Sequence, residues 1–188
     1  MTSTLYSPLV VRALELAAMW HQGQFRKNPA EQVPYVVHPA YVGFLLQQAG
    51  FDDETIAAGM LHDVLEDCGV TREQIASATS PRVAELVSAV SELPKDVDWE
   101  ERKAAYRVVL ETAPIEALAI AAADHISNIR SIADMAQVNG EIWNVFHAKK
   151  AQRLVHEEAV YAIIESRLKN ALVADLRHAI DLMHQLPD

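Results

Sequence analysis

The sequence is poor in cysteine and glycine, and it lacks any stretch with the features of a membrane span or a secretory signal. It contains one cysteine, Cys68, and six glycines among 188 residues. A single cysteine excludes an intrachain disulfide and is typical of a reducing compartment. The apolar run from Ala117 to Ala123 is much shorter than the roughly 20 residues that a transmembrane helix needs. The N-terminus lacks the residue order of a signal peptide. These absences predict a soluble, cytoplasmic protein without a membrane partner.

Positive charge is also scarce. The 16 lysine and arginine residues are outnumbered by 26 aspartate and glutamate residues, which gives a formal net charge of −10. Such a surface repels duplex nucleic acid, whose binding usually requires a basic stripe. We therefore expect no nucleic-acid partner. A small anionic substrate is still compatible with this charge where basic residues gather locally.

The residues that are abundant are apolar and favour helices. Apolar residues make up 51% of the sequence, and alanine and leucine are common among them. A chain of 188 residues is expected to form one domain, here residues 1–188, and to bury about 70% of its unfolded surface. No segment alternates apolar and polar residues for long enough to predict a strand. The expected fold is therefore all-α, a helical bundle in a single domain.

Caps and apolar periodicity predict where the helices begin and end. Ser7-Pro8 places a capping residue before a proline at the first helical position. Thr71-x-x-Gln74 and Asp98-x-x-Glu101 are capping boxes, and Asn139-Gly140 is expected to break the chain. The predicted helices are 8–21, 40–49, 53–67, 71–78, 81–90, 98–111 and 115–138, followed by one or two amphipathic helices over 141–185.

The segment from Met60 to Asp67 combines apolar and ionisable residues at helical spacing. Its ionisable residues are expected to share one side of a helix, because residues three and four apart are surface neighbours; they are His62, Asp63, Glu66 and Asp67. Three crowded carboxylates repel one another unless a cation or a proton offsets their charge. A divalent metal bound by His62 and Asp63 would resolve this repulsion. Glu66 and Asp67 would then be left to handle protons. The alternative is a solvated acidic helix face with one histidine.

Two further positions have the character of metal ligands, which must converge from several segments. His38 precedes Pro39 at an expected helix start, and Asp124 follows three alanines in an otherwise apolar helix. A carboxylate buried there would be costly without a partner, and a metal would supply one. Asn128, four residues on, points the same way and would orient a bound phosphate or water. The alternatives are an ion pair with a neighbouring helix for Asp124 and a structural role for His38.

Basic residues gather at a few places in this acidic chain. Arg26-Lys27 lies in a proline-containing loop, 24–34, ahead of His38, whereas Arg102-Lys103 and Arg107 lie on one predicted helix and Arg130 follows Asn128. Cations near a predicted metal site indicate an anionic ligand such as phosphate. The alternative is a solvated face or ion pairs within the helices, since exposed charges need no special explanation.

The remaining histidines and the aromatic residues receive no chemical role from the sequence. The histidines interpreted as structural or surface residues are His21, His125, His147, His156, His178 and His184. The aromatic residues, including Tyr35 and Tyr106, are expected in the core or at the rim of a site. One of them is a candidate to stack on a base, but the sequence does not indicate which.

Four blocks of the sequence resemble the HD-superfamily hydrolase domain of RelA/SpoT homologues. They are Arg26-Lys27, Pro34-Tyr35-Val36-Val37-His38-Pro39, Leu61-His62-Asp63-Val64-Leu65-Glu66-Asp67 and Ala123-Asp124-His125-Ile126-Ser127-Asn128-Ile129-Arg130. Many HD phosphohydrolases contain the His-Asp pair, whereas the acidic pair after it marks the alarmone-hydrolysing branch. The short chain, without a synthetase region, is similar to small alarmone hydrolases of the metazoan type. The resemblance covers about residues 10–135, and the C-terminal helices, about 141–185, match it only in character.

The resemblance implies hydrolysis of the 3′-pyrophosphate of guanosine tetra- or pentaphosphate, (p)ppGpp, to GDP or GTP and pyrophosphate. It implies Mn²⁺ as the cofactor, and a bound divalent ion generally polarises phosphoryl oxygens and acidifies water. The metal ligands implied in this way are His38, His62, Asp63 and Asp124.

The same resemblance assigns the remaining site residues. Glu66 and Asp67 would position and activate the attacking water, and the crowded carboxylates are expected to raise the pKa of Glu66. Arg26 and Lys103 would contact phosphate, and Asn128 would help to hold the nucleotide near the metal.

Departures from the family pattern leave the substrate open. The loop between Arg26 and His38 is longer than in the family, the usual lysine near Ala121 is absent, and His125-Ile126-Ser127 replaces other residues. The replaced residues line the expected base pocket, so an adenosine alarmone, (p)ppApp, or the 2′-phosphate of NADPH remains an alternative substrate. A non-catalytic binding module is the alternative from another class, and the complete ligand set argues against it. The sequence is compatible with an oligomer and does not define one.

Overall fold

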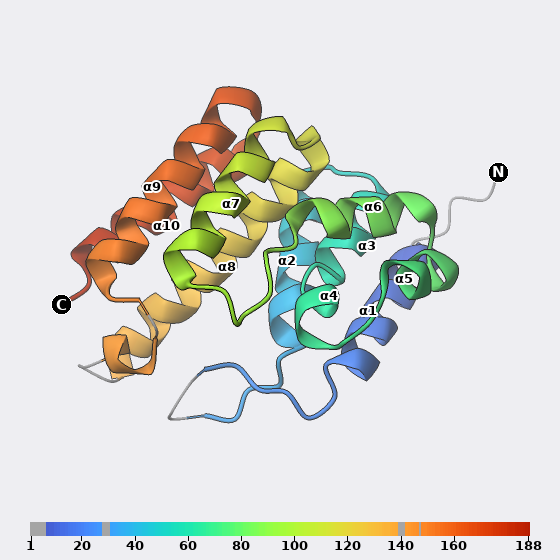
Figure 1. The fold of residues 1–188 in the computed structure, drawn as a ribbon, viewed down its shortest axis with the longest axis horizontal. Coiled ribbons are helices and arrows are strands. Elements are labelled where there is room, and N and C mark those ends of the chain that lie inside the picture. The colour runs from blue at the N-terminus through green and yellow to red at the C-terminus, as the bar shows by residue number, and fades with distance from the viewer. Residues whose placement is uncertain (1–6, 28–30, 139–141, 147) are drawn as a thin grey trace.

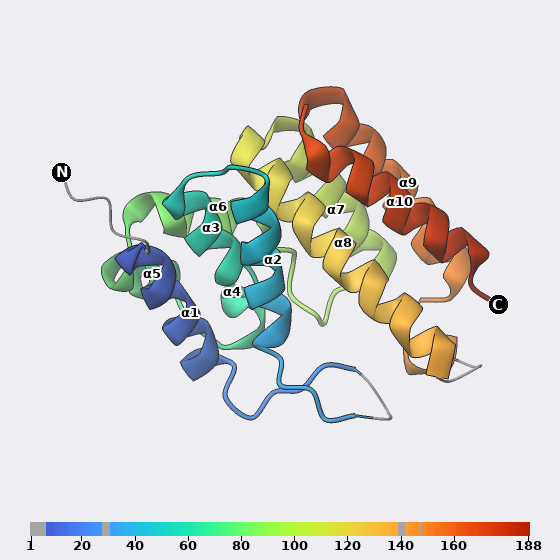
Figure 2. The ribbon, with the colours of Figure 1, turned by 180° about the vertical axis from the view of Figure 1, so that it is seen from behind.

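The computed structural model describes residues 7–27, 31–138, 142–146 and 148–188, and the chain is all-α (Figures 1 and 2). Among the described residues no strand forms, and an isolated bridge joins Phe25 to Pro34. None of the described helices is long and apolar enough to cross a membrane. The helices are α1 (Pro8–Trp20), α2 (Val37–Gln48), α3 (Asp53–Met60), α4 (Val64–Asp67), α5 (Arg72–Ala78), α6 (Pro81–Val90), α7 (Trp99–Thr112), α8 (Ile115–Val138), the 3₁₀ helix η1 (Ile142–Val145), α9 (Lys150–Arg167) and α10 (Ala171–Gln185).

Helix α8 lies at the centre of the fold. It contacts α2, α3, α6, α9 and α10, and Figure 2 shows it running between α2 and α10. Its first half is rich in buried alanines, which let neighbouring helices approach closely because the distance between packed helices depends on the side chains at the contact. Asp124 follows this buried run directly and is therefore half-buried at the edge of the core.

Helix α3 packs against α1, α2 and α6, and glycines allow its close approach to α2. A Cβ atom on Gly59 of α3 would lie 2.3 Å from Cδ1 of Leu46 on α2, and one on Gly43 of α2 would lie 2.5 Å from Cε of Met60. Such distances are far below a normal van der Waals contact. The missing side chains therefore allow the second half of α2 to pack closely against the end of α3, which His62 and Asp63 follow.

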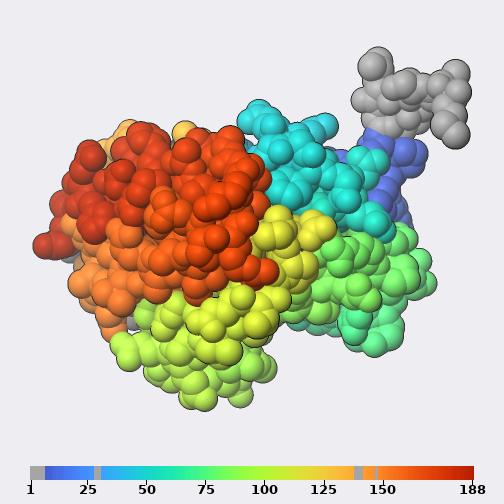
Figure 3. Space-filling view, turned by 90° about the horizontal axis from the view of Figure 1, so that it is seen from above, coloured from blue at the N-terminus to red at the C-terminus, as the bar shows by residue number. Residues whose placement is uncertain are grey.

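The C-terminal helices cover one end of the molecule. Figure 3 shows α9 and α10, in orange and red, as one mass beside the α7 and α8 region. Arg167 at the end of α9 donates hydrogen bonds from Nη1 to the carbonyls of Leu110 and Glu111, at 3.1 and 3.0 Å. The bond to Glu111 satisfies a carbonyl at the end of α7, where the last carbonyls lack helical partners, whereas the carbonyl of Leu110 also accepts from the amide of Ala113. The C-terminal helices thus hold α7 in place.

Local signals in the sequence predicted most helix boundaries. The side chain of Ser7 accepts a hydrogen bond from the amide of Val10, and Thr71 and Gln74 form both bonds of the predicted capping box. Helix α8 has the bounds predicted for it. Asp98 caps α7 by accepting from the amide of Glu101 at 3.4 Å, which is one of the two bonds of the predicted box. The predicted break at residues 139–140 lies outside the described residues.

Two predicted helices have different bounds in the structure. The single helix predicted over 53–67 is interrupted, because α3 ends at Met60 and α4 begins at Val64. The ring of His62 donates from Nδ1 to the carbonyl of Gly59 at 2.8 Å, and in a continuous helix that carbonyl would accept from the amide of Asp63. The helix predicted to begin at residue 40 begins at Val37, so His38 lies in the first turn of α2 instead of ahead of it.

Candidate metal centre and substrate cavity

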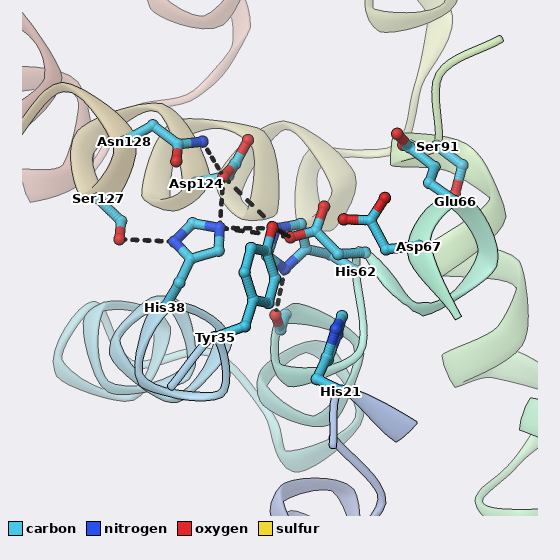
Figure 4. A network of polar contacts seen from close by, with 12 residues as sticks. His21, Tyr35, His38, His62, Glu66, Asp67, Ser91, Asp124, Ser127 and Asn128 are labelled. Atoms are coloured by element: carbon cyan, nitrogen blue, oxygen red, sulfur yellow. Dashed lines mark hydrogen bonds and ion pairs between the residues drawn. The ribbon is translucent and has the colours of Figure 1, made fainter. Parts of the chain in front are cut away.

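Four side chains converge from three parts of the fold (Figure 4). His38 comes from the first turn of α2, His62 and Asp63 from the turn between α3 and α4, and Asp124 from α8. Nε2 of His38 lies 3.2 Å from Nε2 of His62 and 3.0 Å from Oδ1 of Asp124. Oδ2 of Asp63 lies 3.0 Å from Nε2 of His62 and 3.5 Å from Nε2 of His38. The structure therefore brings together all four predicted ligands.

These separations fit a common cation. Donor atoms that lie about 2.1 Å from one ion are about 3.0 Å apart at octahedral and about 3.4 Å apart at tetrahedral angles. The separations of 3.0 to 3.5 Å that involve the imidazole nitrogens are close to this range. Donor atoms of His38, His62 and Asp124 all lie within 4.8 Å of one another. Asp63 lies next to both imidazoles but does not belong to that group. The two imidazoles are buried, whereas the side chains of Asp63 and Asp124 are 18% and 23% exposed. A bound ion would thus be anchored from the interior and open on the carboxylate side.

The histidine rings are oriented from behind. His62 donates from Nδ1 to the carbonyl of Gly59, and Nδ1 of His38 is hydrogen-bonded to Oγ of Ser127 at 2.8 Å. A histidine that donates from Nδ1 keeps a free electron pair on Nε2, and metal-binding histidines almost always have such an outer partner. The described residues therefore fit a divalent metal by chemistry as well as by distance.

The carboxylates have outer partners too. Tyr35 donates to Oδ2 of Asp63 at 2.6 Å, and Nδ2 of Asn128 donates to Oδ1 of Asp124 at 2.6 Å. Arg26 in turn donates from Nη2 to Oδ1 of Asn128 at 3.0 Å. From the sequence, Tyr35 was expected only in the core or at the rim of a site. Its contact with Asp63 spans 28 positions of sequence, so no local pattern identified it.

Within the group of four, neighbouring charges shift the pKa values of His62 and of the two aspartates. Burial acts to lower the pKa of His62, but Asp63 and Asp124 outweigh it and hold the pKa well above its usual value. Burial acts to raise the pKa of both aspartates, but His62 and His38 outweigh it and hold both pKa values below the usual range. A divalent cation would compensate the two carboxylates in the same way with a larger charge.

Glu66 and Asp67 lie beside this group on α4 (Figure 4). Oε1 of Glu66 accepts a hydrogen bond from the amide of Glu92 at 2.8 Å. Burial raises the pKa of Glu66 to about 7, with a further contribution from the carboxylate of Asp63. Crowding, the cause expected from the sequence, is thus secondary to burial. Asp67 is paired with Lys95.

A cavity of about 600 Å³ opens beside the candidate ligands and is lined by His62, Asp63 and Asp124 but not by His38. Many charged residues line it; the cations are Arg26, Lys27, Lys95, Arg102, Lys103 and Arg153. Both Arg102 and Lys103 are paired with Glu92. Among the described residues, no carboxylate within ion-pair distance of Lys27 or Arg153 is found. The cavity is thus richer in cations than the chain as a whole, whose net charge is −10. The carboxylates that also line it are Asp63, Glu66, Asp67, Glu92, Asp124 and Glu157.

Two cations predicted to belong to this group do not line the cavity. Arg107 contacts His156, with 3.1 Å between Nη1 and Nδ1. Arg130 bonds to the hydroxyl of Tyr41 at 2.5 Å and lines a separate groove of about 710 Å³ between α2 and α8. Arg107 and Arg130 are therefore better interpreted as residues that bond within the fold than as cations that bind an anionic ligand.

A second cluster of histidines was not expected from the sequence. Nδ1 of His125 lies 2.5 Å from Oε2 of Glu157, both side chains are buried, and both line the cavity. Because arginine can only donate, its bond with Arg107 makes Nδ1 of His156 an acceptor, so Nε2 carries the proton and cannot bind a metal. The cluster therefore consists of two hydrogen-bonded pairs, His125 with Glu157 and His156 with Arg107, and the two histidine rings lie 5.5 Å apart between centroids. It joins α8 to α9 over 32 positions of sequence, and no local pattern would have identified it.

Comparisons with known families and curated proteins give consistent results. A family model described as an HD domain matches residues 13–154. A guanosine-3′,5′-bis(diphosphate) 3′-pyrophosphohydrolase of Aquifex aeolicus is 33% identical over 162 residues, which cover 85% of this chain and 21% of the relative. The enzyme of that name from Vibrio cholerae is 36% identical over 60% of this chain and 16% of its own length. The chain thus spans about a fifth of the length of these relatives.

Solved structures of similar length match the fold. One, described as a metazoan orthologue of SpoT that hydrolyses ppGpp, superposes with a TM-score of 0.79 at 28% identity and covers 95% of this chain and 97% of its own. Another, lmo0812 from Listeria monocytogenes, superposes with a TM-score of 0.71 at 28% identity and covers 77% of this chain and 96% of its own.

Proposed function

The chain belongs to the HD-domain family, and from this we propose that it hydrolyses the 3′-pyrophosphate of (p)ppGpp to GDP or GTP and pyrophosphate. The observation that carries the proposal is the convergence of four candidate ligands beside a carboxylate of raised pKa, at the wall of a cavity that lysine and arginine side chains help to line. The names of the Aquifex and Vibrio relatives and of the metazoan structure support the same reaction.

We propose Mn²⁺ as the cofactor and His38, His62, Asp63 and Asp124 as its ligands. Carboxylate oxygens are ligands that suit manganese, and imidazole is tolerated by most divalent transition metals. When bound, the ion would supply Lewis-acid stabilisation of charge on a phosphoryl oxygen. The open side of the group faces the cavity, so a substrate phosphate has access to it.

Glu66 and Asp67 are proposed to act on the attacking water. The water forms a new bond to phosphorus while its proton moves to Glu66, and the bond to the departing oxygen breaks. A pKa near 7 suits a general base at neutral pH, and burial gives Glu66 such a value. Asp67, which is paired with Lys95 and lines the same cavity as Glu66, is proposed to orient the water.

The cations and the amide in the cavity are proposed to bind substrate phosphate. Arg26 and Lys103 lie on opposite segments of the wall, in the loop after α1 and on α7. Each offers a charge-assisted hydrogen bond to a phosphate oxygen. Asn128 already bridges Arg26 and Asp124, so a phosphate that contacts it lies next to the metal ligands.

We also propose that the chain forms one domain and acts in the cytoplasm on a small nucleotide. The central helix α8 contacts helices from both halves of the chain, which favours one cooperative unit. The single cysteine is typical of a reducing compartment.

The test is hydrolysis of guanosine tetraphosphate by the purified protein with and without added Mn²⁺, with pyrophosphate and phosphate measured separately. We expect pyrophosphate release that stops on chelation and returns with Mn²⁺. The same assay with (p)ppApp and NADPH compares the alternative substrates. His184→Gln, at an exposed residue paired with Glu158, is a matched control that should keep full activity. Absence of pyrophosphate release from guanosine tetraphosphate in the Mn²⁺-loaded protein would refute the proposal.

A further inference from the structure

Tyr106 on α7 is a buried tyrosine whose hydroxyl has no partner among the described residues. The residue is 5% exposed, and its side chain lines the cavity. No described group donates to its hydroxyl or accepts from it. Buried tyrosine hydroxyls usually find a hydrogen-bond partner, so an unpaired one at the wall of a cavity indicates a ligand.

The hydroxyl of Tyr106 faces the open volume of the cavity. The fully enclosed side-chain atoms without a partner are Arg102 Nε, Arg153 Nε and His156 Nε2. The hydroxyl of Tyr106 is not among these enclosed atoms, so the volume it reaches is the cavity that its side chain lines.

The ring of Tyr106 is held in a fixed position. It stacks on His125 with ring centroids 6.2 Å apart and an angle of 29° between the planes. His125 is in turn bonded to Glu157 of α9. The ring centroid of His156, also on α9, lies 6.4 Å from the ring centroid of Tyr106. The C-terminal helices thereby fix the direction in which the hydroxyl points, and little conformational entropy is lost when it binds a ligand.

The surroundings of Tyr106 favour a phosphate oxygen as the acceptor. Arg102 and Lys103 precede it by four and three residues, so all three side chains lie on one face of α7 and line the same cavity. Burial, and then the charges of Asp124 and Glu92, hold the pKa of Tyr106 well above its usual value. The phenol therefore stays protonated and can donate.

We propose that the hydroxyl of Tyr106 donates a hydrogen bond to the distal phosphoryl group of the substrate pyrophosphate, beside Lys103. This inference rests on the proposed function. A pyrophosphate whose first phosphorus lies at the group of four ligands carries its second phosphorus one bridging oxygen away. Asp124 and His125 of α8 line the same cavity as Tyr106, and Arg102, Lys103 and Tyr106 form its wall on α7. Tyr106 thus adds a neutral donor to the two cations of that wall and discriminates for a second phosphoryl group.

Tyr106→Phe tests this proposal because it removes only the hydroxyl. A hydrogen bond to a charged group contributes enough that its loss should lower kcat/KM for guanosine tetraphosphate by about 10- to 100-fold. The dissociation constant of inorganic pyrophosphate, measured by calorimetry on the Mn²⁺-loaded protein, should rise by about 10-fold or more. The melting temperature and metal content should stay unchanged, because no bond within the protein is lost. Tyr161→Phe, whose hydroxyl bonds to Glu165 on the exposed side of α9, is the matched control and should leave all four values unchanged.

Three results would overturn the proposal. The first is that Tyr106→Phe stays within two-fold of the parent in both kcat/KM and pyrophosphate binding. The second is an effect on turnover without an effect on pyrophosphate binding. The third is a loss of bound metal or of thermal stability, which would show that the hydroxyl has a structural role. Failure of the proposed function is distinguishable. If the parent does not hydrolyse guanosine tetraphosphate but binds pyrophosphate, the calorimetric comparison still decides for or against Tyr106. If the parent does not bind pyrophosphate either, the inference is wrong.

Discussion

The side chains of Arg26 and Asn128 are joined by a hydrogen bond of 3.0 Å between Nη2 and Oδ1, although the residues lie 102 positions apart in the sequence. Asn128 also donates a hydrogen bond of 2.6 Å from Nδ2 to Oδ1 of Asp124. The loop after α1 is thereby tied to a candidate metal ligand on the central helix. A substrate phosphate that displaces or joins this contact would act on both.

We expect Arg26 and Asn128 to be energetically coupled. Arg26→Ala and Asn128→Ala should each lower kcat/KM about 10-fold, and the double variant should lose less than the product of the two effects, with a coupling of about 1 kcal/mol. A double-mutant cycle on guanosine tetraphosphate hydrolysis measures this. Arg12, an exposed residue paired with Glu15, supplies the control cycle with Asn128, and its effects should be additive. Additive effects in the first cycle would contradict the coupling.

Metal binding and proton transfer should separate between neighbouring residues. Asp63→Ala removes a candidate ligand and should lose both bound metal and turnover. Glu66→Gln keeps the shape of the side chain and its bond with the amide of Glu92. It should retain the metal and lose about 100-fold or more in kcat, since it cannot accept a proton. Elemental analysis and steady-state rates on the same samples test this. Full activity of Asp63→Ala would show that the ligand assignment is wrong.

Activity should fall as the pH is lowered below neutrality. Burial raises the pKa of Glu66 to about 7, and the carboxyl group must be ionised to accept a proton. kcat/KM should therefore rise with pH through this region, and a nearby bound cation would move the midpoint downward. Rates between pH 5 and 9, with metal content determined at each pH, check this. A profile that stays flat between pH 5 and 7 at constant metal content would exclude Glu66 as the base.

The carboxyl group of Glu66 should also affect the thermal stability of the protein after a chelator has removed bound metal. Its pKa is higher in the folded than in the unfolded protein, so folding favours the protonated form, and ionisation of Glu66 destabilises the fold at high pH. Glu66→Gln removes this penalty. The variant should melt at a higher temperature than the parent at pH 8, and the difference should shrink between pH 7 and pH 5. Thermal unfolding in the presence of a chelator measures it. An equal difference in melting temperature at pH 8 and at pH 5 would argue against the raised pKa of Glu66.

Close packing between α2 and α3 should be needed for stability and for metal binding. The Cβ atom of Gly59→Ala would lie 2.3 Å from Cδ1 of Leu46, which is fully buried. Overpacking of this kind costs about 1–3 kcal/mol, and any shift of Gly59 moves the carbonyl that orients His62. We expect a lower melting temperature and weaker metal binding.

The compensating change for Gly59→Ala is Leu46→Val, which removes the clashing atom. The double variant should recover part of the stability that Gly59→Ala loses. If Gly59→Ala alone melts at the temperature of the parent, the packing argument is incorrect.

The sequence predicted the parts of the fold that depend on local chemistry. Ser7 caps α1 and Thr71 caps α5 as expected, because a cap needs only the residues within one turn. The bounds of α8 follow from Pro114 before it and from its own apolar periodicity. The all-α fold was predicted correctly for the same reason. The roles assigned to the four ligands and to the acidic pair remain predictions that the structure makes feasible.

What the sequence could not indicate depends on contacts between distant segments. The pairs Tyr35 with Asp63 and His125 with Glu157 involve residues 28 and 32 positions apart, and neither leaves a local pattern. The interruption after α3 was missed because residues 53–67 keep helical spacing throughout. It arises from the bond between His62 and Gly59, which competes with the helix for one carbonyl.

That interruption has a consequence for how relatives are recognised. Consecutive side chains on a regular helix diverge by about 100°, yet the adjacent His62 and Asp63 place donor atoms 3.0 Å apart because the main chain turns between α3 and α4. A relative that restored an uninterrupted helix here would keep every motif residue and still lose the geometry. Inspection of its motif would then classify an inactive protein as an enzyme.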